Sequence, residues 1–445
     1  MSESHRCSRA DSCREAARKR RAVIRRAAIA IAAVALLAAP WPAGAAAQRS
    51  EDQRLVSRFF SPAHSHFGST VAMDRFGDFA LVGAPEGGSQ GGGGVYHFQF
   101  LADTDWYNHT RSSASPTGSP QPFALDIEGI LGIASLREID EENSVLAFNY
   151  HGGLGALLQN LHPTEIRAVA LQAEGTEFLA LGHPDWSQER GLVWIFERND
   201  DGDWGLTAGF QGVLPGERLG SSLAAKTGVL VAGSPGYGAN GAVFIYVRGE
   251  EWIEWQRLDS PAESQLDAEF GAAVDIEAEG YWIAVGSPFV DRVTSPGERV
   301  DVGAVYLYEN VGFAWEYETL LRPPGASHDD HFGASVALHD VVLVAGSPGE
   351  DGAVGDEGAA YVYQRSGSLW STVPRLRLFD AEAEEHDALG TSVAAGDLGA
   401  LVGAPYHDGN DVYDQGAVLF YRGIVTLFTD GFESGGTTAW SGTVP

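Results

Sequence analysis

The sequence predicts an all-β protein in which one unit of four antiparallel strands repeats seven times along 445 residues. Two observations indicate this fold class. The 56 glycines recur in fixed sequence contexts, which is typical of an internal repeat. After residue 50, short runs of β-branched and aromatic residues alternate with polar ones, and the sequence shows no sustained helical period. We therefore expect strands throughout.

Three short motifs define the unit. It opens with Phe-Gly or Leu-Gly, runs through an apolar strand to Gly-Ala-Pro or Gly-Ser-Pro, and resumes after a polar loop at Gly-Ala-Val or a close variant. Five copies are clear, and they open at Phe67, Leu219, Phe270, Phe332 and Leu389. In these copies the first two motif glycines are 13 or 15 residues apart. Two eroded copies are expected, one around Leu131-Gly132 with Ala147-Phe148-Asn149 as its second motif, and one at Arg167-Ala168 with Gly182-His183-Pro184.

The copy that opens at Phe332 shows how the four strands are expected to lie. They cover Ala334 to Leu338, Val341 to Ala345, the alternation around Tyr361 and Tyr363, and Trp370 to Leu378. Glycine permits close backbone approach where units meet, and proline ends the second strand because it has no N–H to donate. Four-stranded sheets repeated around a centre form a propeller. The sequence therefore predicts a seven-bladed β-propeller of four-stranded antiparallel blades.

The ends of the repeat region predict how the ring closes. Arg54 to Phe60, followed by Ser61-Pro62, has the pattern of a fourth strand without strands one to three before it. The last unit ends with its third strand at Val418 to Tyr421 and has no clear fourth strand of its own. We expect the N-terminal strand to complete the last blade.

The region from Arg54 to Tyr421 resembles the FG-GAP repeat family of integrin α-subunit heads and bacterial secreted proteins. The resemblance implies a seven-bladed propeller with a binding face, made by the loops that join strands two to three and four to one. Relatives bind proteins or glycans through that face, so the resemblance implies a cell-surface binding or adhesion module. The face would include Glu86 to Gly93, Phe289 to Val302, Gly349 to Glu357 and Tyr406 to Gln415.

Metal ligands are expected away from the position that integrin-type relatives use. Those relatives hold calcium in the hairpin between strands one and two, whereas short turns such as His339-Asp340 and Gly396-Asp397 stand there in this chain. Acidic residues gather on the binding face instead. The candidate calcium ligands are Asp351, Asp356, Asp408, Asn410, Asp411 and Asp414. Such loops would bind calcium weakly; the alternative is that they are solvated acidic turns.

Catalytic patterns in the sequence are weak, and no catalytic residue is predicted. Gly87 to Gly91 spells a nucleophile-elbow string, but that motif requires a strand-to-helix turn. His64, His66 and the run His328 to His331 are ligand types for zinc or iron. They precede Phe-Gly in two different blades, so we interpret them as repeat-derived polar loops and keep metal ligation as the alternative. An extracellular polysaccharide-active enzyme with paired carboxylates remains the alternative to a binding module.

The N-terminal residues 1–47 have the order of a secretory signal peptide. A basic cluster precedes the apolar run Ala27 to Ala39, and small residues precede a cleavage point near Ala47. Both cysteines, Cys7 and Cys13, lie in this segment. Its removal would leave 20 basic and 57 acidic residues, a net charge near −37.

That charge repels nucleic acid and anionic membranes and attracts cationic partners. We expect a secreted or cell-surface monomer without a membrane span. Its parts would be the signal peptide at 1–47, the propeller at 48–422 and a C-terminal tail at 423–445. The tail, with Phe428 to Gly435 and Trp440-Ser441, resembles a segment that recurs on secreted proteins of Gram-negative bacteria, which implies a role in sorting or processing; the alternative is a disordered end.

Overall fold

A computed structural model describes residues 47–55, 65–85, 94–101, 105–112, 121–128, 131–137, 144–149, 153–158 and 166–424, the last range without 174, 176, 262–266, 292–299, 313 and 409–412. The chain divides into two compact units, Met1–Ala45 and Ala46–Pro445. All described residues belong to the second unit. The predicted signal peptide up to residue 46 and the predicted tail from residue 425 lie outside them.

Six sheets of the described residues have four antiparallel strands each. Five of them use four consecutive strands: β3 (Thr70–Met73), β4 (Phe79–Ala84), β5 (Gly94–Leu101) and β6 (Asp105–Ser112); β7 (Gln121–Glu128), β8 (Leu131–Arg137), β9 (Ser144–Asn149) and β10 (Gly153–Leu158); β11 (Ala168–Gln172), β12 (Phe178–His183), β13 (Leu192–Arg198) and β14 (Trp204–Gln211); β15 (Leu223–Lys226), β16 (Val229–Ser234), β17 (Ala242–Arg248) and β18 (Trp252–Asp259); β19 (Ala273–Ile276), β20 (Trp282–Ser287), β21 (Ala304–Asn310) and β22 (Trp315–Leu321). The sixth combines β28 (Ser392–Gly396), β29 (Gly399–Ala404) and β30 (Ala417–Arg422) with β2 (Gln53–Leu55). A single short helix, α2 (Trp186–Glu189), is described between β12 and β13.

The remaining strands form a sheet of six, so the described residues contain six four-stranded blades rather than the seven predicted. This sheet contains β23 (Val336–His339), β24 (Val342–Ser347), β25 (Ala359–Ser366), β26 (Leu369–Trp370), β27 (Leu376–Phe379) and β1 (Ala47–Ser50).

Two local features explain the difference. The strand predicted from Trp370 to Leu378 is split into β26 and β27, with Pro374, which has no N–H to donate, in the gap. The N-terminal strand β1 then adds in parallel to the outer edge of β27, with Ala47 opposite Leu376. Charge and hydrophobic pattern gave no indication of this additional strand.

The predicted closure of the last blade is confirmed. β2 pairs with β30 in the antiparallel sense, with Arg54 opposite Leu419 and Leu55 opposite Val418. The strand starts at Gln53, one residue before the predicted start, and residues 56–60 lie outside the described part. The N-terminal segment therefore contacts two neighbouring sheets, through β1 and through β2.

The motif glycines hold the sheets together. The N–H of Gly333, which has a φ of +89°, donates to the carbonyl of Gly346 at 2.8 Å. A Cβ atom on Gly346 would overlap the carbonyl oxygen of Gly390 in the next sheet. The same clash would arise at Gly403 against Gly68, where the last repeat meets the first. The glycine of the first motif thus adopts a positive φ, and the glycine of the second motif lies too close to the neighbouring repeat to carry a side chain.

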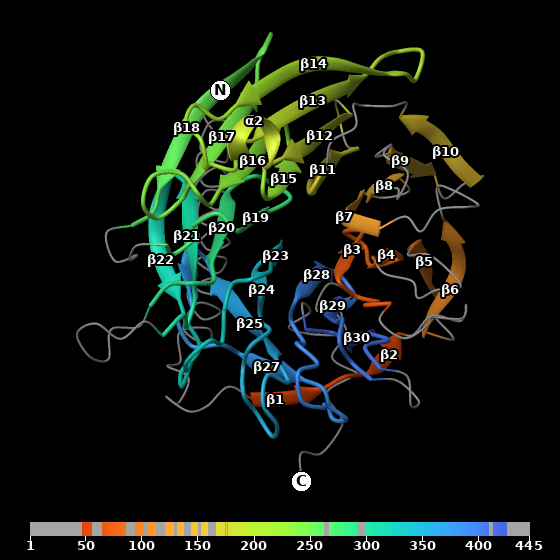
Figure 1. Ribbon diagram of the computed structural model, residues 1–445, viewed down its shortest axis with the longest axis vertical. Helices are drawn as coiled ribbons and strands as arrows, with labels where there is room; N and C mark the ends of the chain where they lie inside the picture. The colour runs from red at the N-terminus through yellow and green to blue at the C-terminus, as the bar shows by residue number, and fades with distance from the viewer. Residues whose placement is uncertain are drawn as a thin grey trace, which may run out of the picture. The chain divides into compact units, whose positions relative to one another are not determined.

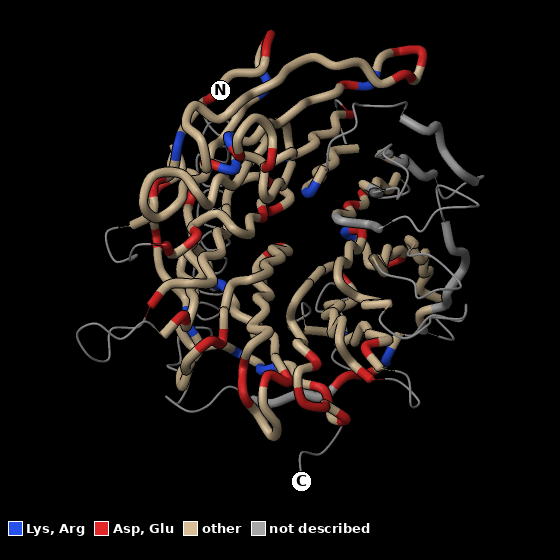
Figure 2. The backbone as a smooth tube through the Cα atoms, in the orientation of Figure 1, with Lys and Arg blue, Asp and Glu red and all other residues tan. Residues whose placement is uncertain are grey.

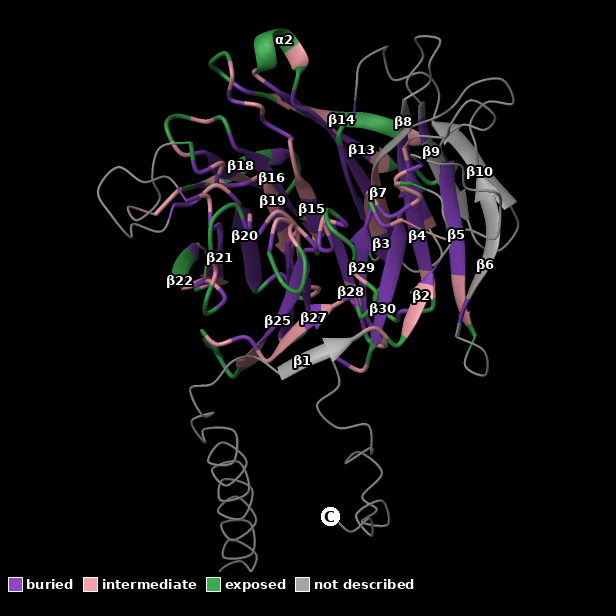
Figure 3. Cartoon of the chain, turned by 60° about the horizontal axis from the view of Figure 1, so that its bottom comes forward, coloured by how far each residue is buried: buried purple, intermediate pink, exposed green. Residues whose placement is uncertain are grey.

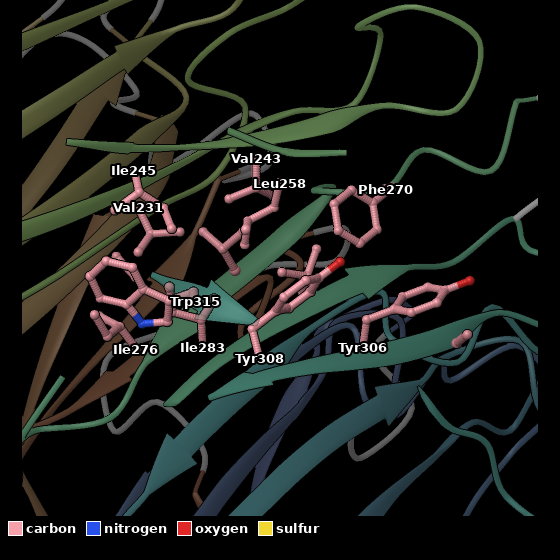
Figure 4. Packing of buried hydrophobic residues seen from close by; sticks show 14 of the residues in the cluster. Val231, Val243, Ile245, Leu258, Phe270, Ile276, Ile283, Tyr306, Tyr308 and Trp315 are labelled. Atoms are coloured by element: carbon pink, nitrogen blue, oxygen red, sulfur yellow. The ribbon is translucent and has the colours of Figure 1, made fainter. Parts of the chain in front are cut away.

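The sheets surround a common centre, and their first strands face it (Figure 1). Contacts between first strands run from β3 to β7, β11, β15, β19, β23 and β28, and from β28 back to β3. Buried residues concentrate between adjacent sheets (Figure 3). Between β15–β18 and β19–β22, for example, Val243 and Ile245 pack near Phe270, Tyr306 and Trp315 in one apolar cluster (Figure 4).

The strand assignment in the first eroded copy is wrong. Leu131 and Gly132 lie in β8, the second strand of their sheet, and Ala147 to Asn149 lie in β9, the third. The first strand is β7, which contacts β3 and β11. Its segment 124–128 reads Ala-Leu-Asp-Ile-Glu, close to the Ala-Val-Asp-Ile-Glu of 273–277 in a clear copy. The similarity between these two segments could not be recognised from the motifs, because this copy lacks the motif glycines.

Candidate functional site

The loops that join strands two to three and four to one lie at one end of the sheets, because neighbouring strands are antiparallel. Two of the predicted binding loops are described in large part, Gly349 to Glu357 and Tyr406 to Gln415. Residues 86–93 and 292–299, which contain most of the other two, lie outside the described part. In the orientation of Figure 2, acidic residues gather along the lower edge, around β1, β27 and the loops before β25 and β28.

The candidate calcium ligands occur in two separate pairs. Asp351 Oδ1 accepts a hydrogen bond from the N–H of Asp356 at 3.0 Å, and Asp356 Oδ2 lies 2.9 Å from His386 Nδ1. In the next loop, Asp408 Oδ1 accepts from the N–H of Asp414 at 2.7 Å. The structure therefore gives Asp351 and Asp408 the same local role, the closure of their own loops. Asn410 and Asp411 lie outside the described residues.

Three groups of side chains in the described part bring three possible metal ligands within 4.8 Å of one another. They are Asp301, Asp329 and His331; His339, Asp340 and Asp397; and Asp380, Asp387 and His407. The first group uses two residues of the predicted run His328 to His331 and adds one from the preceding loop. The second joins two hairpins that are too short for an integrin-type calcium loop. His64 lies outside the described residues.

The third group is buried and is tied to the N-terminal strand by Arg54. One guanidinium nitrogen donates to Asp380 Oδ1, and another lies 3.0 Å from His407 Nε2. Because arginine only donates, Nε2 must accept, so His407 Nδ1–H donates to Asp387 Oδ2 at 2.9 Å. Burial lowers the pKa of His407, but the hydrogen bond and charge of Asp387 outweigh burial and raise it. His407 thus links Asp387 to Arg54, and its Nδ1 carries a proton.

A second buried network fixes the loop Gly349 to Glu357. Arg377 Nε donates to Glu350 Oε1 at 2.7 Å, and a terminal nitrogen donates to Glu357 Oε1 at 3.0 Å. Tyr361 donates to the same Glu350 oxygen at 2.9 Å. The other Glu357 oxygen accepts from the N–H of Ala353 at 2.8 Å. Burial raises the pKa of Glu350 although Arg377 opposes the shift.

A cavity of about 450 Å³ lies beside this network. Its charged or aromatic lining residues are Glu350, Asp351, Glu357, Arg377, Phe379 and Asp380. Four of these six carry negative charge and one carries positive charge. The cavity is therefore acidic, and it is located between the loops of the predicted binding face.

A family profile described as the FG-GAP repeat matches residues 315–363. This segment runs from the fourth strand β22 to the third strand β25, and its motifs recur in the other copies. The chain therefore contains an FG-GAP repeat, and its sheets have a β-propeller arrangement.

Among solved structures, the crystal structure of Sqt1 from Chaetomium thermophilum matches with a TM-score of 0.47 and 15% sequence identity, over 82% of this chain and 89% of that one. None of the curated proteins matches the chain. No helix in the described part of the chain is long and apolar enough to cross a membrane.

The centre of the propeller contains a second cavity, of about 490 Å³, lined by the first strands. Lys226 Nζ donates to Glu128 there at 3.0 Å. Asp126 accepts from the N–H of Leu171 in the next sheet at 2.7 Å, and Asp275 does the same with Leu338 at 2.6 Å. Burial raises the pKa of Asp275 to about 7. These side chains join neighbouring sheets.

The buried residues of the predicted binding face were not predicted from the sequence. Arg54, Asp380, Asp387 and His407 come from three segments, with both aspartates in the connection between β27 and β28, and their spacing follows no known ligand motif. One signal was available in the repeat itself. Glu350 and His407 both stand four residues after the second motif glycine, where the copies at Leu219 and Phe270 have Tyr237 and Val290.

Proposed function

We propose that this protein is a secreted or cell-surface binding module, with a role in adhesion, that presents an acidic loop face to a protein, glycan or cationic partner. The observation that carries the proposal is the pair of buried networks beneath the face. Arg377 holds the loop Gly349 to Glu357 from below, and Arg54 holds the connection after β27. Loops fixed in this way lose little freedom on binding, which favours affinity.

The scaffold supports this proposal. Loops carried on a rigid scaffold are common places for recognition. We infer a ring of seven blades, with the six-stranded sheet counted as one of them. The contacts between first strands return from β28 to β3, and Gly403 packs on Gly68 across the join.

The charge of the chain narrows the class of partner. The full sequence has a formal net charge of −31, and without residues 1–47 it would be more negative still. Such a protein repels nucleic acid and anionic membrane surfaces and attracts basic surfaces. We propose a monomer that is exported by residues 1–47 and is not an enzyme. Weak calcium binding at Asp351 with Asp356, and at Asp408, Asn410, Asp411 and Asp414, belongs to the same proposal.

The competing function is an enzyme that acts on extracellular polysaccharide. The buried carboxylates Asp380 and Asp387 are the observation that favours testing it, since paired carboxylates carry glycoside hydrolysis. Arg54 and His407, however, already engage them. A pair committed to internal hydrogen bonds suits a structural role better than a catalytic one.

A binding screen separates the two classes. The chain from residue 48 onward is applied to arrays of glycans and basic proteins at ionic strengths of about 0.01 M and about 0.15 M, where the Debye length falls from about 30 Å to about 8 Å. We expect binding without turnover that weakens at the higher salt. Turnover of a polysaccharide that disappears in Asp387→Asn would instead establish the enzyme, and no salt-sensitive binding to any array would overturn the proposed module.

A further inference from the structure

Two buried carboxylate oxygens on the binding face have no hydrogen-bond partner: Asp380 Oδ2 and Glu350 Oε2. Asp380 exposes only 1% of its side chain, and its other oxygen accepts from Arg54 and from the N–H of Glu382. The nearest nitrogen recorded for Oδ2 is His407 Nδ1 at 3.8 Å, beyond hydrogen-bonding distance. A buried carboxylate oxygen without a hydrogen bond costs free energy, so a hydrogen-bond donor bound to either atom would be stabilising.

Both residues line the same cavity of about 450 Å³. One water needs only about 10–15 Å³ by this measure, so the space can take a whole side chain. Glu277 is a similar carboxylate that does not line this cavity, so it serves as a comparison. It is also buried and held through one oxygen by an arginine, Arg365, and its other oxygen also lacks a partner. Glu277 lines neither of the two cavities described above.

The two residues also depart from the repeat. Glu350 stands where other copies have Val290 and Tyr237. Asp380 follows the last core leucine of the fourth strand by two residues, a position that Ser260 and Pro323 occupy in other copies. The fold therefore does not require carboxylates at these positions, since other blades form without them.

We propose that this cavity is a pocket for a cationic side chain of a protein partner, an arginine or a lysine, whose N–H groups bond Glu350 and Asp380. This inference rests on the proposed binding function and names the chemistry that the face recognises. A guanidinium or ammonium group brings several donors and one positive charge, which matches two free acceptors and the excess of carboxylates. Phe379 adds an aromatic ring to the wall, and it already lies under the Arg377 guanidinium with 5.9 Å between them.

Calcium fits the same pocket less well. It takes six to eight oxygen ligands, whereas Glu350 Oε1 is already bonded by Arg377 and Tyr361, and Asp380 Oδ1 by Arg54. The positive Arg377 in the wall would also repel a divalent ion more strongly than a single charge. Calcium is therefore an outcome of the test and not the proposed ligand.

The test is calorimetric titration of the chain from residue 48 onward with the peptide acetyl-Gly-Arg-Gly-amide. The control peptide carries citrulline, which has the shape of arginine without its charge. We expect the arginine peptide to bind and the citrulline peptide not to. Glu350→Gln keeps an acceptor for Arg377 and Tyr361 and should weaken binding at least about tenfold, the factor expected for loss of one charge-assisted hydrogen bond. Glu277→Gln is the matched control, and it should leave affinity unchanged.

Each other outcome has a defined meaning. Equal binding of the citrulline peptide, or equal loss in Glu350→Gln and Glu277→Gln, overturns the pocket. Binding of calcium alone that is lost in Glu350→Gln and excludes the peptide also overturns it, in favour of a metal site. If the peptide does not bind at all, the pocket is wrong, and the array screen decides separately whether the face binds anything. Thermal unfolding of each variant confirms that it is folded.

Discussion

Replacement of Arg54 by methionine should destabilise the propeller strongly. Arg54 lies on β2, the strand that closes the last blade, and it donates to Asp380, whose side chain is 1% exposed. Methionine keeps much of the bulk but leaves this carboxylate buried without its counter-charge. Removal of one partner from a buried ion pair typically costs about 3–5 kcal/mol. The free energy of unfolding should fall by that amount at neutral pH.

Two further variants separate this effect from simple loss of packing. The double variant Arg54→Met with Asp380→Asn removes the charge as well, and it should regain most of the lost stability, which gives a large coupling energy in the double-mutant cycle. Arg54 also contacts Glu51 at 3.1 Å and Glu382 at 2.9 Å, and Glu382→Gln removes the second of these carboxylates, whose side chain is 76% exposed. Exposed pairs are worth about 0–1 kcal/mol, so this variant should be nearly neutral.

The assay is urea unfolding of the chain from residue 48 onward, with the slope of each curve compared to confirm that the same surface is exposed. Burial raises the pKa of Asp380 although Arg54 opposes the shift, so loss of Arg54 should raise it further. The folded single variant then retains a proton that the unfolded chain releases, and the destabilisation should shrink as pH falls. A loss under about 1 kcal/mol at neutral pH, or no pH dependence, would refute the assigned role of Arg54 in closing the ring.

Three other perturbations test the fold and the metal proposal. Gly346→Ala would place a methyl group on the carbonyl of Gly390 and should lower the free energy of unfolding by at least about 1–3 kcal/mol. Gly205 has open space around it, so Gly205→Ala should leave that free energy almost unchanged. Equal urea unfolding midpoints for the two variants would contradict the close packing at Gly346. Burial raises the pKa of Asp275 from 3.8 to about 7, so stability should fall as pH rises through this window, by at most about 1.4 kcal/mol per unit. Asp275→Asn should flatten that slope, and an unchanged slope would exclude Asp275 as its cause. Calcium near about 10⁻³ M should raise the melting temperature slightly, and the double variant Asp351→Asn with Asp408→Asn should abolish the rise. A large rise that survives both substitutions would place the metal elsewhere. No rise in the unsubstituted protein would mean that these loops are solvated acidic turns that bind no calcium.

The motif spacing predicted the fold well because each motif glycine obeys a constraint that repeats in every blade. Gly333 adopts a positive φ, and Gly346 has no room for a side chain. The spacing between the two glycines therefore varies little from one repeat to the next. Where these glycines are lost, the prediction failed, as in the misplacement of Leu131 and Gly132. The parallel strand β1 was also missed, because an edge strand of four residues has no pattern of its own.

The site was predicted less well for a different reason. The loops of the binding face follow from the repeat, but the residues beneath them come together only in space. Arg54 and Asp380 are 326 positions apart in the sequence, and their pairing depends on which blade the N-terminal strand completes. That strand could be placed from the sequence, whereas the partners of its side chains could not.

The acidic residues of the face fall into two classes, and the distinction shows where binding should be sought. Asp291, Asp351 and Asp408 each stand five residues after the second motif glycine, and each accepts a backbone N–H of its own loop. Their conserved spacing within the chain is explained by turn formation alone. Glu350 and Asp380 have no counterpart in the copies at Leu219 and Phe270, and each keeps one oxygen free of hydrogen bonds. Carboxylates that keep one oxygen outside the internal hydrogen bonds are the ones available to a partner, so specificity should depend on this second class even though the first contributes at least as much charge.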